Sequence, residues 1–421
     1  MIPEIADPAG PRHAVPADVI DAESFATLEF ELLYASGGAR HRERRLAPQV
    51  NLWRDILPDG LDAALIGKRA GDRVTRRYDL LGPSMRRDPA LVREIRFKDF
   101  DGHVYPQWPL QPDLGRFLPQ GTLHRAGIGG IFRENRKPFR VTSIGPESFV
   151  ADRNHPLAGA PVEVVVSVVS VSRKSGDRGG RCVDWTEVLA DGPGMQLRAG
   201  GQPTAFFERD WAARPAEGSD AEFYAKPRFV AHIDRRAIEA VTALYGEILC
   251  DGMRILDLMS ADRSHLPTTL RAAHVAGLGM NAEELDRNRV LSDRLVHDLN
   301  AHPRLPYADA TFDAAISTVS FEYLTRPVDV VGDVARVLRP GAPFAVTFSD
   351  RWFPPKVVKV WSTAHPYERL GYVLECFLRT GAFEGLETLA VRGYPRPEDD
   401  PHFGETAEGD PVFAVWGRRR I

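Results

Sequence analysis

The sequence predicts two folded blocks: an α+β block, followed by an α/β block built on a doubly wound, mostly parallel sheet. Two observations carry this prediction. A β-branched run at residues 162–171 closes a first region that holds strand-like segments and one short helix. From about residue 226 onward, short apolar strands alternate with amphipathic helices, the pattern of a parallel sheet with helices on both faces. A chain of 421 residues is long enough for two such blocks, each with its own core.

The N-terminal part of the chain divides into a tail and a first block. Residues 1–24 carry acids and prolines in place of an apolar stretch, so we expect a disordered tail and no signal peptide. The block at 25–172 opens with a strand at 25–34. It continues through a Pro-Asp-Gly turn into a short helix that Gly67 ends. One face of that helix is expected to hold Leu61, Leu65 and Ile66.

Residues 173–225 predict an irregular connector between the two blocks. Glycine and proline recur through it and interrupt each candidate helix. Its large apolar side chains indicate that it packs on a folded domain and is not a free linker. These side chains are Trp185, Phe206, Phe207 and Trp211.

Strand–helix alternation organises the second block, residues 226–421. Apolar residues at helical spacing predict helices within 236–249 and 328–338, the second ended by Pro340-Gly341. Short apolar runs predict buried strands at 255–258, 274–278, 314–319 and 344–348. In such a sheet, ligands bind beyond the carboxyl ends of the strands. The functional site is therefore expected within 257–265, 277–284, 298–300 and 317–323.

Composition excludes several classes of protein. The formal net charge is −4, so the chain lacks the basic surplus of a general nucleic-acid binder. Hydrophobic residues make up 43% and charged residues 27%, which is typical of an ordinary globular protein. No apolar stretch is long enough to predict a membrane span. Cys182, Cys250 and Cys376 are odd in number and far apart, which indicates neither a disulfide framework nor a metal site and favours a cytoplasmic location.

Several motifs of the second block occur in a family-specific order. Ile255-Leu256-Asp257-Leu258 is followed by Gly277-Leu278-Gly279-Met280-Asn281, then by Asp298 and by Leu338-Arg339-Pro340-Gly341. The most specific run is LPYADATFD at residues 305–313. Over about 235–350 the block resembles a class I S-adenosylmethionine (SAM)-dependent methyltransferase of the small-molecule type. The resemblance implies a Rossmann-like fold, SAM as cofactor, and a small molecule or a protein as methyl acceptor.

The resemblance also implies which residues contact the cofactor. It assigns Asp257, Met259, Ser260, Ala261, Gly279, Asn281, Asp298 and Leu299. The family has a glycine-rich turn after its first strand, whereas this sequence has Met259-Ser260-Ala261. The family's ribose-binding acid aligns with Gly279, which leaves Asn281 as the nearest polar substitute, and Asp298 matches the adenine-binding acid. Taken singly, Asp257 is also compatible with a cap of the local backbone, and Asp298 with a solvated turn residue.

No residue stands out as catalytic. An oxygen or nitrogen nucleophile can need a general base, and the candidates at strand ends are His265, Glu322, Tyr323 and His365. Nothing in the sequence selects among them. The segment Arg351-Trp352-Phe353-Pro354-Pro355-Lys356 can form an aromatic wall for the acceptor or can fill the edge of the core. The sequence holds no metal-ligand spacing such as HExxH, so no metal is expected.

The first block carries a second resemblance. Asn154-His155-Pro156-Leu157-Ala158-Gly159 looks like the late signature of bacterial FKBP-type peptidyl-prolyl isomerases that carry a domain inserted in the flap. Residues 57–65 are similar to their central helix, and residues 87–92 to the entry into the insertion. The resemblance implies an α+β FKBP-like domain over about 25–172 that can bind a proline-containing peptide. Ser84 and Val164 replace aromatic pocket residues of that family, so weak isomerase activity is expected.

The sequence therefore predicts a SAM-dependent methyltransferase with an appended FKBP-like domain. An alternative is open: a peptidyl-prolyl isomerase or chaperone-like peptide-binding protein whose second domain does not bind cofactor. The loss of glycine from the turn at 259–261 favours the alternative, whereas Asp298 and the run at 305–313 favour the enzyme.

Overall fold

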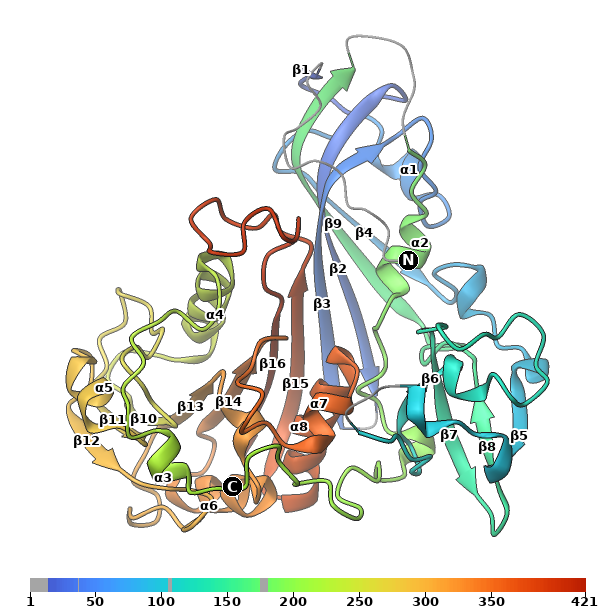
Figure 1. Ribbon diagram of the computed structural model, residues 1–421. Helices are drawn as coiled ribbons and strands as arrows, with labels where there is room; N and C mark the ends of the chain where they lie inside the picture. Colours follow the sequence, from blue (N-terminus) through green and yellow to red (C-terminus); the bar gives the residue numbers. More distant parts are fainter. Residues whose placement is uncertain (1–13, 37, 105–107, 175–180) are drawn as a thin grey trace.

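One large sheet runs through both blocks of this computed structural model, which describes residues 14–36, 38–104, 108–174 and 181–421 (Figure 1). Within those residues, twelve strands form the large sheet and four form a second, separate sheet. The order in the large sheet is β1-β9-β2-β3-β15-β16-β14-β13-β10-β11-β12, and β4 pairs with β9.

The C-terminal part of the large sheet is doubly wound and mostly parallel, as the alternation predicts. Its parallel strands, in spatial order, are β12 (Asp293–Val296), β11 (His274–Gly279), β10 (Arg254–Leu258), β13 (Ala314–Thr318) and β14 (Pro343–Phe348). Strand β16 (Val412–Arg419) lies antiparallel between β14 and β15 (Phe383–Arg392). The four expected strands are confirmed; β12, β15 and β16 lie outside the runs that the sequence analysis identified.

Helices cover both faces of this parallel region. They are α4 (Arg235–Ile248), α5 (Ala282–Arg287), α6 (Pro327–Val337), α7 (Lys359–Thr363) and α8 (Pro366–Thr380), with a 3-10 turn η7 (Phe321–Tyr323). Neighbouring residues of β10 point to opposite faces: Ile255 packs in the core with α4, whereas Leu256 packs in the core with α6 and α8. The expected helices at 236–249 and 328–338 are thus confirmed as α4 and α6, each with its apolar side on the sheet.

The first block is an antiparallel sheet with one short helix. It consists of β2 (Ser24–Ser36), β3 (Ala39–Asn51), β4 (Arg73–Tyr78), β9 (Val162–Lys174) and α1 (Leu61–Leu65). Leu61 and Leu65 are fully buried, as expected. Ile66 is instead 47% exposed, because the helix ends at Leu65 and Ile66 has an extended conformation that turns it away from the apolar face.

Between β4 and β9 the chain makes a smaller body with its own core. Its sheet has the order β5-β8-β7-β6, formed by β5 (Val92–Arg96), β6 (Phe117–Pro119), β7 (Pro138–Ile144) and β8 (Ser148–Asp152). Phe139 and Phe149 stack at its centre. Short 3-10 turns connect the strands: η1 (Pro83–Met85), η2 (Pro89–Leu91), η3 (Phe97–Asp99), η4 (Gly102–Val104) and η5 (Gln120–Leu123).

The N-terminal tail is shorter than the sequence analysis expects. Within residues 1–24, β1 (Ala14–Pro16) pairs with β9, and Ile20 is 1% exposed, so residues 14–24 are folded against the first block. Backbone pairing with a long strand and burial of one large side chain offset the entropy of ordering this stretch. Residues 1–13 lie outside the described residues.

The connector packs on both blocks, which confirms the expectation from its apolar side chains. It contains α2 (Trp185–Ala190), the 3-10 turn η6 (Ala199–Gly201) and α3 (Asp220–Phe223). Trp185 enters the core of the first block, whereas Phe206 enters the core of the second. Phe207 and Trp211 are partly buried against the second core.

The two blocks share backbone hydrogen bonds and buried ion pairs. Strand β3 runs parallel to β15, from Ala39 opposite Leu386 to Arg45 opposite Arg392, so the sheet has no break between the blocks. Below this junction the buried Arg116 donates to Glu368 of α8 at 2.7 Å, and the Phe117 N–H donates to the same carboxylate at 2.8 Å. The inserted body is therefore anchored to α8.

None of the described helices is both long and apolar enough to cross a membrane. The three cysteines are free: Cys182 and Cys250 are exposed, and Cys376 is buried.

Replacing Glu368 with alanine is expected to destabilise the junction strongly. Glu368→Ala would leave the guanidinium of Arg116 and the Phe117 N–H buried without an acceptor, at a cost of about 3–5 kcal/mol. Urea denaturation followed by circular dichroism would measure this loss. The control is Glu239→Ala, which removes an exposed pair with Arg235 and should change the free energy of unfolding by less than about 0.5 kcal/mol. Equal losses in the two variants would contradict the prediction.

Candidate functional site

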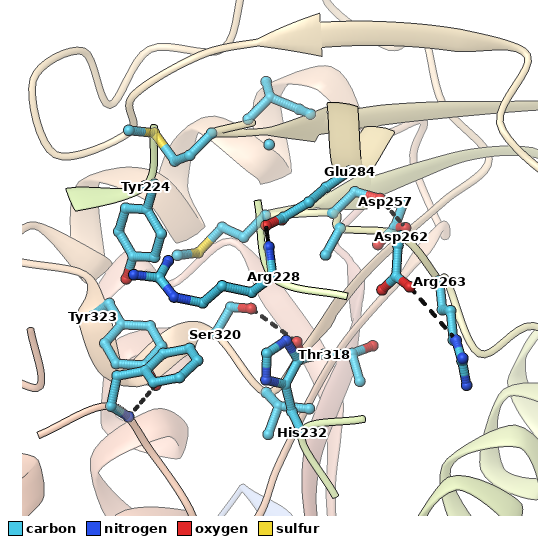
Figure 2. A pocket seen from close by; sticks show the side chains of 18 of the residues that line it. Tyr224, Arg228, His232, Asp257, Asp262, Arg263, Glu284, Thr318, Ser320 and Tyr323 are labelled. Atoms are coloured by element: carbon cyan, nitrogen blue, oxygen red, sulfur yellow. Dashed lines mark hydrogen bonds and ion pairs between the residues drawn. The ribbon is translucent and has the colours of Figure 1, made fainter. Parts of the chain in front are cut away.

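A cavity of about 290 Å³ lies beyond the carboxyl ends of β10, β11 and β13, where the sequence analysis places the site (Figure 2). Seven of the eight assigned residues line it: Asp257, Met259, Ser260, Ala261, Gly279, Asp298 and Leu299. The cavity is also lined by residues of the connector, of α5, and of the segments after β13 and β14. The strand ends therefore bring together residues that are up to about a hundred positions apart in the sequence.

The turn after β10 is built around Asp257. Ser260 and Ser264 each donate a hydroxyl hydrogen bond of 2.6 Å to one oxygen of its carboxylate, Oδ2. Asp257 is 2% exposed, and burial raises its pKa to about 6, although the two hydroxyl donors act in the opposite direction. The carboxylate thus fixes the turn while it borders the cavity.

Met259 adopts a backbone conformation in this turn that glycine usually adopts. Its φ is +59°, in the left-handed region where a side chain is strained, whereas Ser260 and Ala261 stay outside that region. The Ser260 N–H then donates to the carbonyl of Leu278 at 2.8 Å, which binds the turn to β11. The chain therefore makes a close turn without glycine.

Gly279 is required by close packing. An added Cβ at this position would lie 2.1 Å from the carbonyl oxygen of Ser260. This explains why the end of β11 carries no acid: the backbone of the first turn occupies the space that the side chain would need.

Asn281 does not enter the cavity. Its Oδ1 accepts from the N–H groups of Glu283 and Glu284 as the N-cap of α5, and its Nδ2 donates to the carbonyls of Tyr224 and Ala225. Because these four hydrogen bonds use its donors and both acceptor directions, Asn281 cannot substitute for a ribose-binding acid. Its role in this structure is to cap α5 and to hold the connector.

Asp298 and Leu299 form the other end of the cavity. Asp298 Oδ1 accepts from the N–H groups of Asn300 at 2.9 Å and Ala301 at 3.1 Å, which closes a tight turn. Leu299 is 4% exposed and packs in the main core. Asp298 thus has a role in a turn, the alternative that the sequence left open for it, and it lines the cavity as well.

Residues 220–232, which we term the cover segment, line the cavity without having been identified from the sequence. Figure 2 shows Tyr224, Arg228 and His232 of this segment pointing into the cavity. The N–H of Arg228 donates to Glu284 of α5 at 2.6 Å, and burial raises the pKa of this glutamate. Spacing gives no signal for these residues, because the cover segment, at the end of the connector and the start of the second block, has no regular period.

Buried charges hold the cover segment in place. The carboxylate of Asp220 accepts from Arg214 and Lys356 at 2.8 Å each and from Asn300, also at 2.8 Å. Lys356 is 1% exposed, so it anchors the segment from below and does not form part of the expected aromatic wall.

An aromatic wall does line the cavity at Trp352 and Phe353. The ring of Phe353 stacks on Tyr323 with centroids 6.1 Å apart, and the Phe353 N–H donates to the Tyr323 hydroxyl at 2.7 Å. The guanidinium of Arg369 lies 4.3 Å from the ring centroid of Trp352. These contacts fix the wall before any ligand binds.

The general-base candidates fall into two groups. His265 and Tyr323 line the cavity, whereas Glu322 and His365 do not. Burial lowers the pKa of His265 to about 4, so its imidazole is neutral at neutral pH. Glu322 is buried with a pKa raised to about 8, and His365 caps α8. Over the described residues, no cluster of histidine, cysteine and acidic side chains could hold a metal ion.

Gly279→Ala is expected to damage this site. The new methyl group would overlap the Ser260 carbonyl, so the turn at 259–261 must move, and the melting temperature should fall by several degrees for a cost of about 1–3 kcal/mol. The control is Gly246→Ala in α4, whose nearest neighbour would be a Pro267 carbon at 3.6 Å and which should be neutral or stabilising. Calorimetry of both variants is the measurement; equal melting temperatures would contradict the packing argument.

Asp257→Asn is expected to stabilise the protein in a pH-dependent manner. Because the folded-state pKa lies above the ordinary value of 3.8, the acid favours folding only when protonated, and this contribution is lost as pH rises through about 6. Asparagine stays neutral and still accepts from the two serines. The variant should therefore gain on the order of 2 kcal/mol over wild type near pH 7 and much less near pH 4. Urea denaturation at both pH values tests this; a gain that does not change with pH would contradict it.

Comparison with known proteins shows what this part of the chain is similar to. Residues 261–346 match the family model of a methyltransferase domain. Methyltransferase phqN of Penicillium fellutanum is 33% identical over 104 residues, which is 23% of this chain and 32% of that protein. The chain thus matches about a third of the length of this curated relative.

Solved structures similar to the chain include SAM-dependent methyltransferases from Mesorhizobium loti and Aquifex aeolicus. Each is 18% identical, with a TM-score of 0.30. The first match covers 42% of this chain and 96% of the other, and the second covers 49% and 99%. Residues 261–346 thus match a methyltransferase domain, and S-adenosylmethionine is the cofactor that this family implies.

Proposed function

We propose that the chain is a SAM-dependent methyltransferase that transfers a methyl group to a small molecule or a protein. The observation that carries the proposal is the cavity at the strand ends, which gathers Asp257, Glu284 and Asp298 around one space of about 290 Å³. Such a position in a doubly wound sheet is where these folds bind ligands.

The side chains around the cavity fit the chemistry of the cofactor. SAM offers hydroxyl and amino groups as hydrogen-bond donors and carries a positive sulfonium. Acidic side chains that line the cavity, among them Asp257, Glu284 and Asp298, offer carboxylate oxygens as acceptors. Glu284 takes over the role that the sequence analysis sought at Gly279 and Asn281, because it stands one turn further along α5 and its carboxylate reaches the cavity. Leu299 and Met280 supply apolar lining for the adenine.

When bound, SAM supplies a methyl group that an acceptor atom attacks in line with the sulfonium. The residues of this chain hold the two reactants and exclude water. The cover segment shields the cavity from water. Its first residue, Asp220, pairs with Lys356. Just beyond its other end, Asp234 accepts a hydrogen bond from the N–H of Asp410. The aromatic wall at Trp352 and Phe353 forms the side available to the acceptor.

The first block fits the proposed FKBP-like domain in its strand arrangement. An antiparallel sheet with one short helix between β3 and β4, and a separate sheet inserted between β4 and β9, support that proposal. We propose that the helix of this domain binds peptide weakly or not at all, because its apolar residues Leu61 and Leu65 are buried in the core.

Cofactor binding separates the proposed enzyme from the alternative, a peptide-binding protein with an incompetent second domain. Isothermal titration with S-adenosylhomocysteine should give a complex with the wild-type chain. Asp298→Ala and Glu284→Ala should each weaken it by about 1–3 kcal/mol, the scale of one hydrogen bond to a charged group. The control is Asp286→Ala, because Asp286 lies on α5 with a side chain that is 76% exposed and away from the cavity.

If the wild-type chain does not bind S-adenosylhomocysteine at about 1 mM, its binding free energy is weaker than roughly −4 kcal/mol. That result would contradict the proposed methyltransferase function and favour the alternative. If the wild-type chain binds the ligand and neither substitution weakens the binding, the cofactor site lies elsewhere and the site proposed here is overturned.

A further inference from the structure

We propose that the acceptor is a planar aromatic compound with a hydroxyl group, and that His232 is the catalytic base that removes its proton. This inference rests on the proposed methyltransferase function. It concerns the part of the cavity between the cover segment and the aromatic wall, which the cofactor contacts do not use.

His232 is placed to accept a proton. It lines the cavity from the cover segment, and its ring meets Phe353 edge to face with centroids 5.4 Å apart (Figure 2). Throughout the described chain, no hydrogen-bond or ion-pair partner is found for its ring nitrogens. A histidine that is only structural usually hydrogen-bonds through at least one nitrogen when it is mostly buried. His232 therefore has free capacity on the side of the cavity.

The surroundings of His232 favour its neutral form. Burial lowers its pKa, and the guanidinium groups of Arg228 and Arg351 act in the same direction, whereas Asp262 opposes them. His265, a second cavity imidazole, is close enough for the two rings to interact electrostatically. A neutral imidazole can take a proton, so the resting state is the one that a base requires.

The surrounding walls favour an aromatic acceptor. Tyr323 and Phe353 form a stacked pair whose geometry is fixed by a hydrogen bond, and Trp352 extends the same surface. Planar rings bind such surfaces at little cost in conformational entropy. His232 borders this same surface through Phe353, so a ring bound there has its polar edge near the imidazole.

Arg228 can stabilise the negative charge that develops on the acceptor oxygen. Its guanidinium lies 5.2 Å from the ring centroid of Phe353 and 5.5 Å from that of Tyr224. Its side chain makes no ion pair with any described carboxylate, and one of its N–H groups donates to the carbonyl of Phe223 at 3.1 Å. Glu284 interacts electrostatically with this arginine without a side-chain ion pair to it. A guanidinium held by rings and a carbonyl, with no direct ion pair, can stabilise a phenolate that binds beside it.

The phenolic O–H gives its proton to a ring nitrogen of His232, and the oxygen attacks the methyl carbon of SAM. The new C–O bond forms as the C–S bond breaks, and the electron pair of the C–S bond stays on sulfur. The products are an aryl methyl ether, neutral S-adenosylhomocysteine and an imidazolium, which later releases the proton to water. A phenol is almost wholly protonated at neutral pH, with a pKa near 10 for tyrosine, so a base accelerates the transfer.

The test uses the full chain, methyl-labelled SAM and two probes, catechol and 4-nitrophenol. Wild type should methylate catechol, and His232→Gln should lose about 10²-fold or more in rate, the range of one general base. The loss should be much smaller with 4-nitrophenol in mildly alkaline buffer, because that probe is already ionised. The rate with catechol should rise with pH through a pKa below the usual range of histidine in wild type, and this limb should be absent from the variant.

Two controls separate this inference from the proposed function. S-adenosylhomocysteine should bind His232→Gln as it binds wild type, which would show that the cofactor site is intact. His274→Gln, at the amino end of β11 and paired with Asp293, should keep the wild-type rate. If wild type binds the cofactor product but methylates neither probe, the acceptor class is overturned. If His232→Gln methylates catechol as fast as wild type, or loses the same factor with both probes, the role of His232 as base is overturned. Failure of wild type to bind S-adenosylhomocysteine would overturn the proposed function and this inference together.

Discussion

The contact between the turn after β10 and the end of β11 determines the rest of the candidate site. The Ser260 N–H donates to Leu278, and the Ser260 carbonyl lies where a side chain of Gly279 would be. This approach orients Asp257 toward its two serine donors and forces Met259 into a left-handed conformation. It also leaves no room for an acidic side chain at the end of β11, and Glu284 of α5 is the acid from this side that lines the cavity.

The strained and buried groups near the cavity are held by a rigid surrounding. Met259 with positive φ and Asp257 with a raised pKa both cost stability, and neither persists without support from its neighbours. That support comes from the apolar cores on the two faces of the parallel sheet and from the ion pairs that fix the cover segment. These groups thus lower the free energy of unfolding at the place where a bound ligand would raise it.

The junction between the blocks connects the inserted body to the same region. Glu368 and Arg369 are neighbours on α8: the first pairs with Arg116 of the inserted body, and the second lies over Trp352 of the aromatic wall. The continuous ladder from β3 to β15 places both blocks on one sheet. The two blocks are therefore joined by packed, buried contacts, which deform less readily than loops.

The sequence by itself determined the alternation of strands and helices in the second block and the position of the site at the strand ends, because a buried strand and an amphipathic helix each leave a local pattern. It also identified seven residues that line the cavity. It did not reveal Tyr224, Arg228 or His232, since an irregular connector has no period. It misjudged Asn281, because the hydrogen bonds of this side chain depend on the segments that pack beside it. It misjudged Ile66, because the helix ends one residue before it. Only the tertiary structure decided that residues 220–232 line the cavity and that both blocks share a sheet, because these contacts join residues that lie far apart in the sequence.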